Sequence, residues 1–86
     1  MARYRIEISQ SAERQLRKLR REVLSRVVRA ILALGDDPHP KGSRKLSGYD
    51  DVFRIRVSQY RILYSVSGKK LIIIILKIGQ RKDVYR

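Results

Sequence analysis

The sequence predicts an α+β fold in which a hairpin of two helices packs on a small, largely antiparallel sheet. Three observations support this prediction. The chain opens with an alternating segment typical of a strand, continues with two segments of helical apolar spacing, and then contains three strand-like segments joined by short links. The predicted order is β-α-α-β-β-β, and the 86 residues are expected to form one domain over 1–86.

The opening segment alternates strictly between charged and apolar side chains. Because neighbouring side chains of a strand point to opposite faces, we expect a half-buried strand with Tyr4, Ile6 and Ile8 facing inward. Ser9 or Ser11 follows this strand. Either hydroxyl can accept a hydrogen bond from the free N–H groups of a first helical turn, so a helix is expected to begin here.

Two apolar stripes with helical spacing predict the helical hairpin. The stripes comprise Ala12, Leu16 and Leu19, and then Leu24, Val27, Val28, Ile31 and Leu34. The charged stretch 20–22 is expected to mark the bend between the helices. Gly35 suits the end of the second helix, and Pro38 and Pro40 prevent it from continuing.

A polar connector over 41–51 leads into the predicted sheet. Its three strands are expected over residues 52–57, 60–66 and 69–78. The links, Ser58-Gln59 and Ser67-Gly68, are short enough to join antiparallel neighbours, and glycine can supply a positive φ. The apolar run 71–76 does not alternate, so we expect both faces of this strand to be covered and the strand to be central.

Positive charge dominates the composition. The chain contains 21 Lys and Arg against 8 Asp and Glu, which gives a formal net charge of +13 and an isoelectric point near 11.0. Charge of this density favours association with polyanions or with an acidic protein partner. The chain has no cysteine and one histidine, which excludes a disulfide framework and makes a metal centre built on cysteine or histidine unexpected.

The sequence also bears on location. The start lacks the apolar core of a signal peptide, and the longest apolar run, 71–76, is too short to span a bilayer. A cytoplasmic protein without membrane contact is therefore expected.

Arginines interrupt the apolar pattern of the predicted sheet. Arg54 and Arg56 are two residues apart and project from one strand face, and Arg61 lies in the next strand. Arg81 and Tyr85 follow the last strand. Several guanidinium groups and a phenol on one surface suit an anionic ligand, with nucleic acid as the first candidate. The alternative is a solvated strand face followed by a frayed basic tail.

Several segments, in this order and spacing, resemble the RelE/ParE superfamily of toxins from bacterial toxin–antitoxin pairs. They are residues 4–6, 11–19, 45–48, 53–57 and 60–64, followed by Arg81, Val84 and Tyr85. The resemblance runs nearly end to end and implies a RelE-like fold. RelE-type members are ribosome-dependent endoribonucleases. They cut mRNA in the ribosomal A site by attack of a ribose 2′-OH on the adjacent phosphate and need no metal ion or other cofactor.

The resemblance also implies site residues. Catalytic and RNA-binding roles are expected at Arg54, Arg56, Arg61, Arg81 and Tyr85, with a further RNA contact at Lys45. We expect Arg61 and Arg54 to hold the reacting phosphate, because a guanidinium donates two hydrogen bonds to phosphate oxygens and keeps its charge. Arg81 is expected beside the leaving oxygen, and Tyr85 offers a ring on which a base can stack.

One feature departs from the RelE pattern. Some RelE members carry lysine where this chain has Arg54 and Arg56. Because arginine effectively cannot lose its proton, a general base at Arg56 is disfavoured. The 2′-OH proton is left to Tyr85, to a ribosomal group, or to acidification of the hydroxyl by the cationic cluster. Cleavage is therefore expected to be weaker, or to depend differently on pH, than in a lysine-bearing member.

The sequence as a whole predicts a RelE-type mRNA interferase that acts on ribosomes. By resemblance, a small antitoxin with an acidic toxin-binding segment neutralises it, and operator DNA is bound only through the toxin–antitoxin complex. Two alternatives share the fold. A ParE-like protein would inhibit DNA gyrase, and a non-catalytic relative would bind RNA without cutting it.

Overall fold

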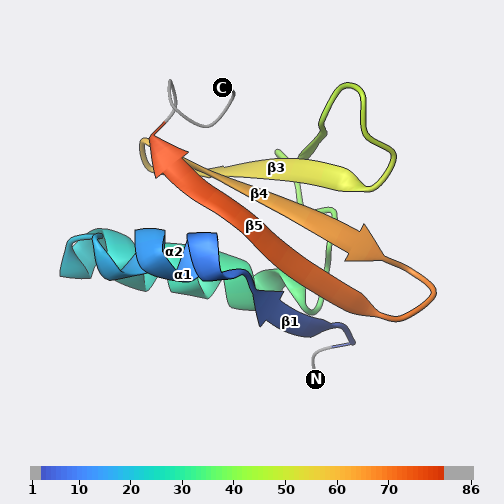
Figure 1. Cartoon of the computed structure of the whole chain (residues 1–86), viewed down its shortest axis with the longest axis horizontal. Helices are drawn as coiled ribbons and strands as arrows, with labels where there is room; N and C mark the ends of the chain where they lie inside the picture. The colour runs from blue at the N-terminus through green and yellow to red at the C-terminus, as the bar shows by residue number, and fades with distance from the viewer. Residues whose placement is uncertain (1–2, 81–86) are drawn as a thin grey trace.

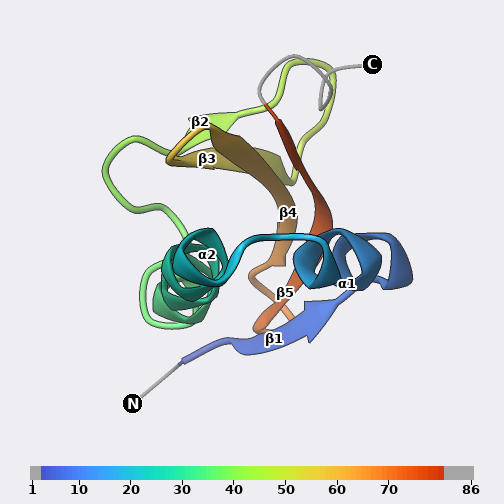
Figure 2. The ribbon, with the colours of Figure 1, turned by 90° about the vertical axis from the view of Figure 1, so that its left-hand side faces the viewer.

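A computed structural model of the chain describes residues 3–80. Its elements are β1 (Arg5–Ile8), α1 (Gln10–Arg17), α2 (Arg21–Leu34), β2 (Arg44–Lys45), β3 (Val52–Val57), β4 (Tyr60–Ser67) and β5 (Ile72–Gln80). The two helices lie together on one side of a five-stranded sheet (Figures 1 and 2). The predicted α+β class and the helical hairpin are confirmed. Arg81 and Tyr85 lie outside the described residues.

The sheet has the strand order β1-β5-β4-β3-β2. β1 runs parallel to β5, and the other neighbouring pairs are antiparallel, so the sheet is mixed but largely antiparallel, as predicted. β5 lies between β1 and β4, so it is not an edge strand, but the central strand is β4 and the prediction that β5 is central is wrong. Ile73 and Ile75 are buried, whereas Ile72 and Ile74, on its other face, are half-buried. The strand is therefore fully buried only on the face that packs against the helices, and the prediction that both faces are covered holds for that face alone.

The sequence did not predict β2. Its two residues lie in the expected connector and pair antiparallel with β3, Arg44 opposite Arg54 and Lys45 opposite Phe53. Two residues cannot show an alternating pattern, so this strand is visible only once β3 is in place.

The helix boundaries follow local signals. Ser9 is the N-cap of α1, and its Oγ accepts from the Ala12 N–H at 3.1 Å. The helices break just before Arg21, close to the predicted bend. Gly35 ends α2 as predicted, although its φ of −62° is right-handed, so the residue is not needed for a left-handed cap.

The core lies between the helices and the sheet. It comprises Ala12, Val27, Ile31, Leu34, Ile55, Ile62, Tyr64, Ile73, Ile75 and Ile78. Tyr4 and Ile6 pack against it as expected, but Ile8 is 42% exposed, so the prediction that Ile8 faces the core is wrong. Ile8 is the last residue of β1, which is an edge strand of the sheet.

Tyr64 ties the connector after α2 to the core. Its ring is fully buried, and its hydroxyl donates to the Pro38 carbonyl at 2.7 Å. Burial raises the pKa of Tyr64 to about 12. Phe53 stacks on this ring, and His39 meets Phe53 edge-on. These contacts hold the connector beside β3.

Within residues 3–80, neither helix is long and apolar enough to cross a membrane.

Candidate functional site

The sheet has one face covered by the helices and an opposite face, which we call the open face. Ile55 is buried in the core, so Arg54 and Arg56, its neighbours in β3, point to the open face. In β4, Ile62 is buried in the core, and Arg61 points away from it. The three strand arginines predicted from the sequence therefore share the open face.

Strand pairing arranges the open-face residues in two rows. In the first, Arg56 lies opposite Arg61, which lies opposite Gly79. In the second, the order is Arg44, Arg54, Leu63 and Lys77. Because a strand rises about 3.3–3.4 Å per residue, the rows are about 6.6–6.8 Å apart. We call them the Arg61 row and the Arg54 row.

The cations of the rows differ in exposure. Arg61 is only 8% exposed, Arg54 and Lys77 are half-buried, and Arg44 and Arg56 are exposed. Arg61 occupies β4, the middle strand of the sheet, between β3 and β5. Its charge is shielded from water more than that of a surface arginine, so it acts more strongly on a nearby anion.

The register orders the strand arginines around Arg61. The two-residue link 58–59 sets Arg56 directly opposite Arg61, and Arg54 lies one row away. The expectation that Arg54 and Arg61 hold one phosphate stays a prediction. The structure does not bring Lys45 into the rows, because Lys45 lies opposite Phe53, which faces the core side.

Two cations of the Arg54 row were missed by the sequence analysis. Arg44 belongs to β2, which has no sequence pattern of its own. Lys77 follows a run of apolar residues and offers no alternating signal. Only the pairing with β3 and β4 shows that both residues belong to the row.

A groove of about 540 Å³ lies between α2 and the outer edge of β3. Its walls are Ala30 and Ala33 of α2, residues 40–42 of the connector, Arg44, and residues 54–57 of β3. Three open-face arginines thus border a hollow whose helix wall is small and apolar.

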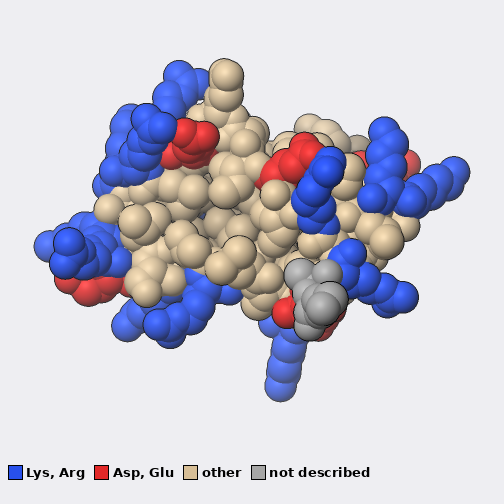
Figure 3. Space-filling model, turned by 90° about the horizontal axis from the view of Figure 1, so that it is seen from below, with Lys and Arg blue, Asp and Glu red and all other residues tan. Residues whose placement is uncertain are grey.

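Basic side chains also lie elsewhere on the surface. Lys and Arg are spread around the rim of the face shown in Figure 3, and acidic groups lie beside several of them. Two exposed ion pairs occur within residues 3–80, Arg5–Glu7 at 2.9 Å and Arg17–Glu13 at 2.5 Å. Exposed pairs of this kind contribute about 0–1 kcal/mol. Net charge thus attracts polyanions to the whole molecule, whereas the two rows give the charge a defined geometry.

Comparison with known proteins identifies the family. A family model described as "ParE toxin of type II toxin-antitoxin system, parDE" matches residues 6–85. The chain belongs to the RelE/ParE superfamily of type II toxins. The predicted family is confirmed.

Named relatives of this toxin are RelE-type proteins. Toxin RelG of Mycobacterium tuberculosis is 33% identical over 89 residues, covering 96% of this chain and 97% of RelG. The mRNA interferase toxin RelE of Escherichia coli is 26% identical over 86 residues, covering 95% of this chain and 90% of that protein. The archaeal RelE–RelB complex from Pyrococcus horikoshii gives a TM-score of 0.84 at 30% identity, with 95% of this chain and 99% of that chain covered. The toxin therefore has a RelE-like fold.

The open face of this toxin suits phosphate chemistry. Guanidinium groups donate paired hydrogen bonds to phosphate oxygens without changing protonation state. Arg54, Arg56 and Arg61 can therefore stabilise negative charge, and none of them can take up a proton from a hydroxyl.

Proposed function

We propose that this toxin is a ribosome-dependent endoribonuclease that cuts mRNA in the ribosomal A site. The observation that carries the proposal is the Arg61 row, in which a buried arginine and an exposed one lie opposite each other on the open face. The similarity to the mRNA interferase of E. coli, over 95% of the chain, supports it.

The reaction joins the ribose 2′-oxygen to the adjacent phosphorus and breaks the bond from phosphorus to the 5′-oxygen. The products carry a 2′,3′-cyclic phosphate and a 5′-OH. Arg61 and Arg56 donate to the non-bridging oxygens as negative charge develops, and Arg54 adds positive charge from the next row. Because Arg61 is screened from water, its stabilisation of that charge is strong.

Arg81 and Tyr85 complete the proposed site from the end of the chain, outside the described residues. Arg81 stabilises the leaving 5′-oxygen, and the Tyr85 ring stacks on a base so that the nucleotide holds an in-line geometry. Lys45 is a peripheral RNA contact. The arginines keep their charge, so the 2′-OH loses its proton to Tyr85, to a ribosomal group, or to solvent after acidification by the cationic rows.

We also propose that a small antitoxin neutralises the toxin. The relative from P. horikoshii is a RelE–RelB complex. On α2 of this chain, Val28 is 38% exposed and Leu32, one turn further on, is 62% exposed. Such a stripe suits an amphipathic helix, and the charge of +13 favours one with acidic residues. Operator DNA is then contacted through the antitoxin complex.

Inhibition of DNA gyrase is the second candidate function. The family model that matches residues 6–85 is described as a ParE toxin, and this favours it. A gyrase inhibitor needs no nuclease geometry, so it leaves mRNA intact on the ribosome.

Toeprinting on ribosomes that carry a defined mRNA and an empty A site separates the two candidates. We expect wild-type toxin to cut inside the A-site codon, and Arg61→Ala to be slower by about 10²–10³-fold, the usual loss for one electrostatic donor. Because Arg61 is buried, its truncation can also disturb folding, so Arg56→Ala, at an exposed position, is assayed beside Arg61→Ala. Arg81→Ala tests the proposed role at the leaving oxygen. Arg29→Ala, on an exposed part of α2, is the control and should cut normally. Intact mRNA with folded wild-type toxin would contradict the nuclease, and supercoiling by gyrase would then be assayed.

A further inference from the structure

β5 contains a β-bulge at Leu76. Leu63 of β4 lies opposite Lys77, and the next β4 residue, Tyr64, lies opposite Ile75. Leu76 therefore has no direct partner in β4. An extra residue of this kind reverses the alternation of side chains beyond it.

The reversal decides where Lys77 points. Ile73 and Ile75 are fully buried, so continued alternation would turn Lys77 into the core. Beyond the bulge it is Ile78 that is buried, at 1% exposure, and Lys77 lies on the open face. The bulge thus keeps the core apolar and delivers a lysine to the other side of the sheet.

Two side chains of the α1 region hold the bulge. Ser9 Oγ donates to the Leu76 carbonyl at 3.0 Å, and the Ile78 N–H donates to Gln15 Oε1 at 2.6 Å. These are backbone groups that a regular ladder would have paired, and leaving them unpaired would cost free energy. Bulges that re-aim side chains are frequent beside functional sites, and this one has dedicated partners.

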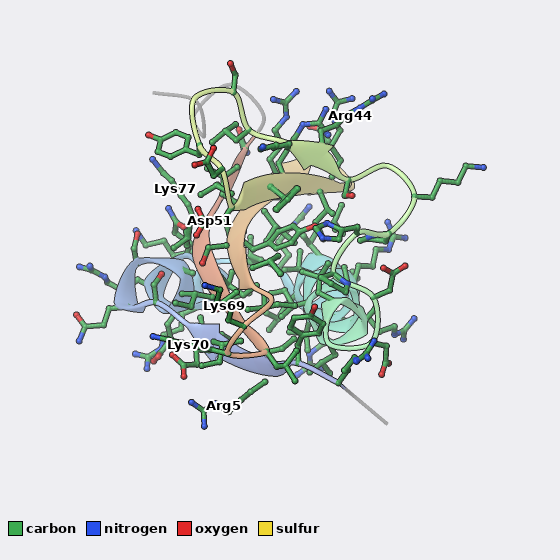
Figure 4. The ribbon with its side chains drawn as sticks, turned by 90° about the vertical axis from the view of Figure 1, so that its right-hand side faces the viewer. Arg5, Arg44, Asp51, Lys69, Lys70 and Lys77 are labelled. Atoms are coloured by element: carbon green, nitrogen blue, oxygen red, sulfur yellow. The ribbon has the colours of Figure 1, made fainter. Side chains whose placement is uncertain are left out.

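Lys77 completes the Arg54 row on the far side of Leu63. β3 and β5 are the two neighbours of β4, so Arg54 and Lys77 lie about 10 Å apart across the sheet, two strand spacings. Neither ion pair within residues 3–80 involves Lys77. Figure 4 shows Lys77 toward the same end of the sheet as Arg44, whereas Lys69 and Lys70 lie toward the hairpin end of β5.

We infer that Lys77 and Arg54 bind one backbone phosphate of a single RNA strand, next to the phosphate held by the Arg61 row. The rows are about 6.6–6.8 Å apart along the β-strands. Consecutive phosphates of an extended RNA strand are spaced by a distance of the same size. A lysine ammonium is a compact, flexible point charge, which suits a phosphate that is held and does not react. The inference rests on the proposed function, since RNA is the ligand.

Ribosomes programmed with two mRNAs test this contact. One mRNA displays an A-site codon with 2′-O-methyl riboses, which cannot be cut, and the other ends in the P site. We expect Lys77→Gln to bind the codon complex about tenfold more weakly than wild type, the effect of losing one charged hydrogen bond. Its salt dependence should fall by about 0.7–0.9 in log–log slope. Binding to the truncated complex should not change, and Lys77→Arg should keep most of the affinity.

Lys69→Gln is the matched control, because Lys69 is an exposed lysine at the other end of the same hairpin. An equal effect of Lys69→Gln and Lys77→Gln would overturn the inference in favour of net charge alone. An equal effect of Lys77→Gln on both ribosome complexes, or wild-type toxin that binds both complexes equally, would also overturn it.

Cleavage of unmodified mRNA, measured in parallel, separates this inference from the proposed function. Lys77-dependent binding of the methylated codon without any cutting of unmodified mRNA would contradict the proposed nuclease and support the phosphate contact. Normal cutting together with unchanged binding by Lys77→Gln would support the nuclease and contradict the phosphate contact. Weaker antitoxin binding by Lys77→Gln, with codon binding unchanged, would assign the lysine to the protein partner and overturn the inference.

Discussion

The two faces of β4 are buried to a similar degree by side chains of different chemistry. On the helix side, Ile62 and Tyr64 are 0% exposed, and on the open side, Arg61 and Leu63 are 8% and 9% exposed. Burying a guanidinium contributes little to stability, since desolvation offsets its interactions. The helix face therefore supplies most of the stability, and the open face places charge where a ligand can use it.

The largest expected effect is the loss of stability caused by a cavity on the helix face. It tests whether the helix face supplies most of the stability. Ile62→Ala removes a fully buried side chain and should lower the free energy of unfolding by about 2–5 kcal/mol. Arg44→Ala, at an exposed position of the Arg54 row, should change it by less than about 0.5 kcal/mol and should instead slow cleavage on ribosomes. Urea unfolding and toeprinting measure the two effects. Equal losses of stability in both variants would break the division between the faces.

Features that depend on local sequence were predictable, whereas features held by distant parts of the chain were not. The bounds of β3 and the orientation of Arg54 and Arg56 follow from local alternation and a two-residue link, and they were predicted correctly. The bulge at Leu76 does not follow from local sequence, because the groups that hold it lie far along the chain. Lys77 was missed for that reason.

The candidate site was predictable only in part. Arg61 was identified from its strand, but its pairing with Arg56 depended on the register. Arg44 depended on a two-residue strand that forms only against β3. The roles of Arg81 and Tyr85 rest on the family resemblance and stay predictions.

An effect of intermediate size is expected at Gln15, whose side chain holds the bulge that places Lys77 on the open face. Gln15→Leu keeps the size of the side chain but leaves the Ile78 N–H without its acceptor, which should cost about 1–3 kcal/mol. If the bulge aims Lys77, this variant should also lose affinity for the methylated A-site codon, because β5 can shift its alternation. Thermal unfolding and the ribosome-binding assay measure both effects. Loss of stability with full codon affinity would show that Gln15 supports the fold without positioning Lys77.

The smallest effect expected on the helix face concerns the Tyr64 hydroxyl, which joins this face to the connector that lines the groove. Tyr64→Phe removes the hydrogen bond to the Pro38 carbonyl and should cost about 1 kcal/mol near neutral pH, with cleavage unchanged. The pKa of Tyr64 is raised from 10.0 to about 12, mainly by burial, so the folded state favours the neutral phenol. Its contribution is therefore fully present below pH 10 and is lost as the pH rises toward 12.

Phenylalanine does not titrate, so the difference in unfolding free energy between wild type and Tyr64→Phe isolates this group from the many lysines. We expect the difference to be constant up to about pH 10 and to shrink above it. Urea unfolding from pH 8 upward measures the difference. A constant difference through pH 12 would mean that the phenol ionises as easily in the folded chain as in the unfolded one. The connector would then be held by ring packing with Phe53 rather than by the buried hydroxyl.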